Sequence, residues 1–122
     1  MGRIGPTHAV VSSGMEEPLA DRLALLRRHI DRATAALASD AAASPVLRAV
    51  VGEFDKKLAK AAAGLPSAPA AAARELIIEL EQAGDSAKVA AEADRGASAD
   101  SKKLVDLAHH AICVLKHELT AG

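Results

Sequence analysis

Apolar side chains recur at intervals of three and four residues along most of the chain, which is the spacing of one face of an α-helix. The clearest stripe lies within a helix predicted over residues 17–39 and consists of Leu19, Leu23, Leu26, Ile30, Ala33 and Leu37. Pro18 suits the first turn of this helix, where a backbone N–H has no intrahelical acceptor. Residues 1–14 contain glycine and proline without this period, so we expect a flexible tail there and one domain over 15–122.

A second helix is predicted over residues 45–63. Ser44 is a suitable N-cap and Pro45 a suitable first residue. Gly64 and Pro66 then end the helical pattern. Its apolar face is formed by Leu47, Val50, Val51, Phe54, Leu58 and Ala61.

A third helix is predicted over residues 68–95, with Ser67 as its cap. Gly84 leaves two alternatives open, because a glycine inside a helix costs only about 1 kcal/mol. The helix either continues through Gly84 or stops there and restarts at Asp85.

The last helix is predicted over residues 99–119. Its expected inner face is formed by Leu104, Leu107, Ala108, Ala111, Leu115 and Leu119, widened by Val105 and Ile112. The connections between the four helices are short, which favours antiparallel neighbours. The sequence therefore predicts an all-α protein, an antiparallel up-down bundle of four helices.

Composition adds that the core should be thin. Half of the 122 residues are hydrophobic, but most of these are small or aliphatic, and Phe54 is the single aromatic residue. Alanine favours helices yet buries little area, so helix backbones should lie close together. A core of this kind supplies modest stability, which favours a homo-oligomer over a monomer.

Charge and cysteine content exclude several classes of function. The net charge is −1 with acidic and basic residues interspersed, which argues against nucleic-acid binding. No apolar run has the length of a membrane span, and no secretory signal is visible. The single cysteine, Cys113, has no internal partner for a disulfide, so we expect a cytoplasmic protein.

The last helix carries the residues best suited to chemistry. Asp106, His109, Cys113 and His117 are expected on its outer side, across from the core. Histidine and cysteine one helical turn apart can bind the same metal ion, and a carboxylate can add a third ligand. One straight helix rarely supplies a whole site, so a second subunit or another helix would have to complete it. From the sequence we therefore favour a solvent-exposed polar face that binds no metal, with a metal site or a subunit interface as the alternatives.

Ala108-His109 also resembles the first half of the signature of histidine phosphotransfer domains. That resemblance implies His109 as the phosphoacceptor of a small helical bundle. Ile112 and Cys113 stand where that family has lysine and glycine.

Elimination leaves a non-enzymatic helical interaction module, an adaptor or a small regulatory subunit, as the first functional hypothesis. It needs no cofactor and acts on a protein partner or on a second copy. Its interface candidates are Leu25, Ile78, Val89 and Cys113. Histidine phosphotransfer through His109 and metal binding through the last helix are the alternatives.

Overall fold

The computed structural model describes residues 16–121, which form four α-helices and no strand. The helices are α2 (Glu16–Ala38), α3 (Pro45–Gly64), α4 (Ala70–Ala93) and α5 (Ala99–Ala121), with a short 3₁₀ helix, η1 (Leu65–Ser67), between α3 and α4. The prediction of an all-α four-helix bundle is therefore confirmed. The predicted tail at residues 1–14 lies outside the described residues.

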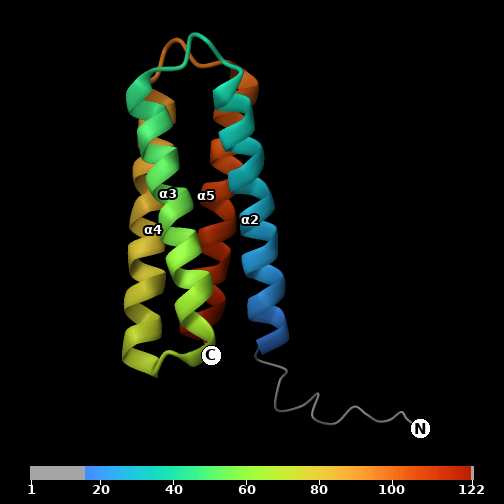
Figure 1. The fold of residues 1–122 in the computed structure, drawn as a ribbon, viewed down its shortest axis with the longest axis vertical. Coiled ribbons are helices and arrows are strands. Elements are labelled where there is room, and N and C mark those ends of the chain that lie inside the picture. The colour runs from blue at the N-terminus through green and yellow to red at the C-terminus, as the bar shows by residue number, and fades with distance from the viewer. Residues whose placement is uncertain (1–15, 122) are drawn as a thin grey trace, which may run out of the picture.

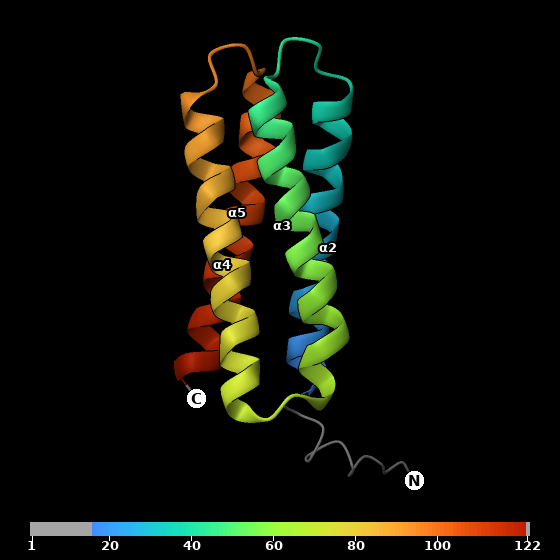
Figure 2. The ribbon, with the colours of Figure 1, turned by 60° about the vertical axis from the view of Figure 1, so that its left-hand side comes forward.

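The four helices run alternately up and down (Figure 1). Each packs against its neighbours in sequence, and α5 closes the ring against α2. The α2–α3 and α4–α5 connections lie together at one end of the bundle, and η1 lies at the other (Figure 2). None of the described helices is long and apolar enough to cross a membrane.

The ends of α3 follow the sequence signals. Ser44 Oγ accepts a hydrogen bond from the backbone N–H of Leu47 at 3.1 Å, and Pro45 is the first helical residue. The α-helix ends at Gly64, and Pro66 lies within η1. The cap satisfies a backbone donor that the helix leaves without a partner.

The start of α4 differs from the prediction that Ser67 caps a helix from residue 68. Ser67 belongs to η1, and α4 begins at Ala70 after Pro69. Ala68 is extended, with φ −77° and ψ 137°. Proline disfavours the helical conformation in the residue before it, so Pro69 delays the helix by two residues.

α4 continues through Gly84, which decides between the two alternatives for this helix. Gly84 is buried, and a Cβ placed on it would lie 2.9 Å from Ile112 Cγ2 and 3.1 Å from Phe54 Cζ. Phe54, the only aromatic residue, is 1% exposed. The missing side chain at Gly84 thus makes the room that Phe54 occupies between α3, α4 and α5.

The inner face of α5 is turned relative to the prediction. Its buried residues include Val105, Ala108, Ile112 and Leu115. Leu104 and Ala111 are partly buried at one margin, and Leu107 and Leu119 are exposed. The helix packs against both α2 and α4, so the centre of its buried face lies along Val105, Ala108 and Ile112, with Leu115 also buried and Leu107 outside this face.

Asp94 joins the two connections at one end of the bundle. Its carboxylate accepts hydrogen bonds from the backbone N–H groups of Ser44 at 2.8 Å, Gly96 at 2.9 Å and Ala97 at 3.1 Å. The bond to Ser44 crosses from the α4–α5 connection to the N-cap of α3. A side chain on Gly96 would collide with the carbonyl oxygen of Ala42, so the two connections pack backbone against backbone.

Asp40 makes the reciprocal contact from the α2–α3 connection. Its Oδ2 accepts from the backbone N–H of Ser98 at 2.8 Å and from the hydroxyl of Ser101 at 2.9 Å. Asp40, in the α2–α3 connection, therefore binds residues at the start of α5, and Asp94, in the α4–α5 connection, binds the N-cap residue of α3.

Candidate metal centre

The contact between α4 and α5 carries a row of polar side chains along its outer edge, which we call the α4–α5 seam. Its members are Glu81, Asp85 and Lys88 of α4, and Asp106, His109, Cys113 and Lys116 of α5. Lys88 Nζ lies 3.5 Å from Asp106 Oδ1, and Lys116 Nζ lies 2.9 Å from Glu81 Oε1. The seam is therefore lined by charged partners on both helices.

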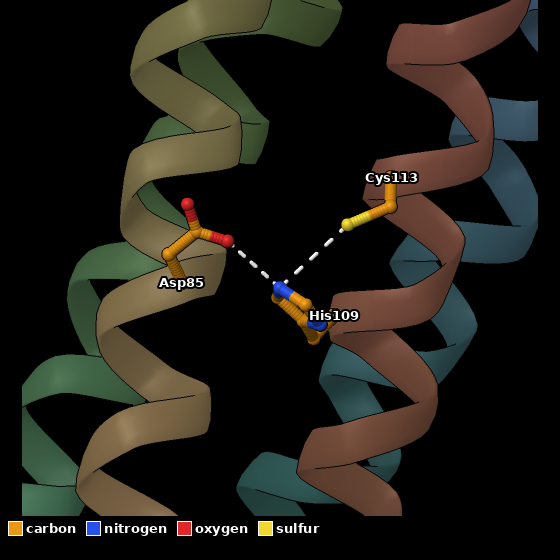
Figure 3. A group of neighbouring side chains, drawn as sticks. All are labelled: Asp85, His109 and Cys113. Carbon is orange, nitrogen blue, oxygen red and sulfur yellow. Dashed lines mark hydrogen bonds and ion pairs between the residues drawn. The ribbon is translucent and has the colours of Figure 1, made fainter.

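Three side chains converge in the middle of this seam (Figure 3). His109 Nε2 lies 2.7 Å from Asp85 Oδ1 and 3.6 Å from Cys113 Sγ. The oxygen, nitrogen and sulfur atoms all lie within 4.8 Å of one another. His109 and Cys113 are one turn apart on α5, and Asp85 reaches them from α4, so the tertiary contact assembles the group.

The group is open to solvent on one side. The side chain of His109 is 18% exposed, whereas that of Asp85 is 56% exposed. Cys113 is partly buried. An ion can therefore reach the group from solvent without opening the hydrophobic core, and the exposed Asp85 side chain has room to move.

The charge state of Cys113 is set by its surroundings. Burial raises the pKa of the Cys113 thiol, and the carboxylates of Asp85 and Glu81 raise the pKa further. Since the carboxylate of Asp85 can only accept a hydrogen bond, we assign the proton between Asp85 and His109 to Nε2. Nε2 is then a donor to Asp85 and not a base for the Cys113 thiol. This geometry does not activate the cysteine as a nucleophile.

The structure brings together part of the predicted ligand set. His109 and Cys113 lie side by side, but they face the seam rather than the outer side of the bundle, because α5 is turned about its axis. Asp106 pairs with Lys88, and His117 is exposed outside the three-residue group. The third member of the group is instead Asp85, which the sequence did not single out as a candidate. A signal for it was present, since Glu81 and Asp85 have the same i,i+4 spacing as His109 and Cys113.

The surroundings of His109 do not favour phosphotransfer. Its Nε2 is engaged by a carboxylate, and Glu81 lies further along the same seam. A phosphoryl group on Nε2 would carry its negative charge against Asp85.

The interface candidates lie in different environments. Val89 is 63% exposed on the outer face of α4, whereas Leu25 and Ile78 are half-buried and Cys113 faces the seam. Val46 in the first turn of α3 is 66% exposed and was not among the candidates.

Comparison with known proteins identifies no relative. No family model matches the chain, and no curated protein or solved structure matches it. The class that the fold and the site define is a four-helix bundle with a mixed nitrogen, oxygen and sulfur donor group between two of its helices.

Proposed function

We propose that the protein binds one transition metal ion of the Zn²⁺ class between α4 and α5. The ligands are Asp85, His109 and Cys113. The observation that carries the proposal is the convergence of a carboxylate oxygen, an imidazole nitrogen and a sulfur within 4.8 Å on two helices. Thiolate and imidazole together favour Zn²⁺ over Mg²⁺ or Ca²⁺, which prefer oxygen ligands.

The distance between the nitrogen and sulfur donor atoms suits this ion. With Zn–N and Zn–S bonds of roughly 2.05 and 2.3 Å, the nitrogen and sulfur ligands of a tetrahedral site lie about 3.5 Å apart. Cys113 Sγ and His109 Nε2 are 3.6 Å apart. Asp85 Oδ1 lies 2.7 Å from Nε2, which is a hydrogen-bond distance. The carboxylate has to withdraw by roughly 0.6 Å to act as a ligand.

Binding exchanges protons for the metal. His109 binds as neutral imidazole, so the hydrogen on Nε2 is lost to solvent and the ring keeps one hydrogen on Nδ1, taken up from solvent if it was absent there. The Cys113 thiol releases its proton to solvent. The bound ion then links α4 to α5 and stabilises the folded state, and the role proposed for the site is binding of the ion. A reduced Cys113 is required, which agrees with the cytoplasmic location that the sequence favours.

Thermal unfolding in the presence of Zn²⁺ tests the proposal. We expect the melting temperature to rise until one equivalent is bound. At a free Zn²⁺ concentration 100 times the dissociation constant, the gain is about 2.7 kcal/mol, or roughly 10 °C for a domain of this size. Chelator should reverse the change.

Matched variants identify the ligands. His109→Gln, Cys113→Ser and Asp85→Asn should each lose most of the Zn²⁺-dependent rise, whereas His110→Gln and Asp106→Asn should retain it. His110 is the exposed neighbour of His109, and Asp106 is the carboxylate that the sequence alone selects. A wild-type protein that Zn²⁺ does not stabilise, or equal loss in the control variants, would overturn the proposal.

A second candidate is the interaction module that acts through self-association or a protein partner. It is favoured by Val46, in the first turn of α3, and Val89, near the end of α4, which are 66% and 63% exposed. Exposed aliphatic side chains on more than one helix favour a partner surface when they form a continuous patch.

Sedimentation equilibrium tests this candidate. We expect the wild-type protein to form a dimer, and Val46→Lys or Val89→Lys to shift the equilibrium toward the monomer. Ala59→Lys, at an exposed position of α3 far from Val46, is the control and should leave the dimer intact. A wild-type protein that is monomeric at every concentration would count against self-association.

A further inference from the structure

The α4–α5 seam has a regular antiparallel register. Asp85 pairs with His109, and Lys88, three residues later on α4, pairs with Asp106, three residues earlier on α5. Four residues in the other direction, the same register places Glu81 opposite Cys113. Glu81 and Asp85 thus form an i,i+4 pair that faces the i,i+4 pair of His109 and Cys113.

We propose that Glu81 is the fourth ligand of the metal site and that Lys116 holds its carboxylate when no metal is bound. This inference rests on the proposed function, which requires only the other three ligands. Four protein ligands from two helices make a closed tetrahedral site, whereas three leave a position for water. The inference therefore assigns the site to binding of the ion itself, with no open position for a substrate.

The position of Glu81 supports this role. Its side chain is 21% exposed, so it lies against the seam and does not extend into solvent. Its charge also acts on Cys113, because its carboxylate raises the pKa of that thiol. Its present partner is Lys116 Nζ, 2.9 Å from Oε1. A glutamate side chain has three rotatable bonds, so rotation can carry the carboxylate from Lys116 toward the ion.

Lys116 then competes with the metal for the same carboxylate. Loss of the lysine should free Glu81 and tighten metal binding, provided that Glu81 is present. Removal of a nearby positive charge alone would instead tighten binding whether or not Glu81 is present. A double-mutant cycle of Glu81 and Lys116 distinguishes release of the Glu81 carboxylate from simple removal of a positive charge.

The experiment measures the affinity of the whole protein for Co²⁺, whose visible absorption reports thiolate ligation and coordination number. We expect Glu81→Gln to weaken binding by about 10-fold or more and to change the intensity of the cobalt spectrum. Lys116→Gln should tighten binding several-fold in the wild-type background and much less in the Glu81→Gln background. Glu81→Ala is a second test of whether the Glu81 carboxylate is a ligand. The melting temperature without metal verifies that each variant is folded.

The opposite flank of α4 supplies the controls. Glu79 pairs with Lys57 and Lys60 of α3, so Glu79→Gln and Lys60→Gln remove equivalent charges away from the site. Both controls should bind Co²⁺ as the wild type does. If wild type binds Co²⁺ and Glu81→Gln binds it equally well with the same spectrum, the fourth ligand is wrong while the three-residue site stands. If wild type does not bind Co²⁺, the proposed function fails and this inference fails with it.

Discussion

Single residues decide how closely the helices of this bundle approach. Gly84 and Gly52 are both glycines inside helices, and helix propensity alone would favour alanine at either position. Their surroundings differ. A Cβ on Gly84 would meet Ile112 and Phe54 in the core, whereas a Cβ on Gly52 would meet nothing within 4 Å. Replacement of glycine by alanine should therefore change the free energy of unfolding in opposite directions at the two positions.

We expect Gly84→Ala to lower the free energy of unfolding by about 1–2 kcal/mol, because the cost of overpacking exceeds the gain in helix propensity. Gly52→Ala should raise it by about 0.5–1 kcal/mol. Urea denaturation of both variants measures the two changes. A stabilised Gly84→Ala variant would show that Phe54 and Ile112 can move apart without cost.

At the scale of the element, the sequence locates the helices better than it orients them. Ser44, Pro45 and Gly64 mark the ends of α3 through local backbone chemistry, which acts within a few residues. The inner face of α5 depends on contacts with α2 and α4 together. Because α5 has apolar residues on more than one side, its periodicity allows several orientations, and only packing selects the one that brings His109 and Cys113 to the seam.

At the scale of the molecule, residues 16–121 form two helical hairpins, α2–α3 and α4–α5, which pack together along their length and share hydrogen bonds at one end. Asp40 and Asp94 each accept backbone hydrogen bonds from the opposite connection. The bonds to Ser98 and then Ser101 lower the pKa of Asp40, and the bond to Ser44 is the main cause of the lowered pKa of Asp94. The folded state therefore favours the charged form of both carboxylates.

These pKa directions predict acid sensitivity. The unfolded chain, where aspartate has a pKa of about 3.9, binds protons at a higher pH than the folded protein does. The stabilisation from Asp40 and Asp94 is thus complete above that value and is lost as the pH falls through the lower folded-state pKa.

We expect Asp40→Asn and Asp94→Asn to be less stable than wild type at neutral pH and to lose less stability on acidification. Urea denaturation between pH 7 and pH 3 measures both effects, with Asp21→Asn as a control on the outer surface of α2. Parallel curves for Asp94→Asn and wild type would contradict the prediction.

The candidate site could be predicted only in part from the sequence, because it depends on contacts between two helices. His109 and Cys113 are recognisable in the sequence because their spacing is local to one helix. Asp85 lies 24 positions before His109, and its contact depends on the antiparallel register of α4 and α5. Asp106 is closer to His109 in the sequence than Asp85 is, but in the fold its carboxylate pairs with Lys88.

By itself, the sequence determined the number of helices over residues 16–121, most of their ends and the all-α class, because periodicity, caps and prolines act over a few residues. The tertiary structure decided what depends on distant contacts. It continued α4 through Gly84 because Phe54 fills the space beside that glycine. It also turned α5 toward α4 and joined Asp85 to His109 and Cys113, since the orientation of a helix follows from the combined burial of all its neighbours.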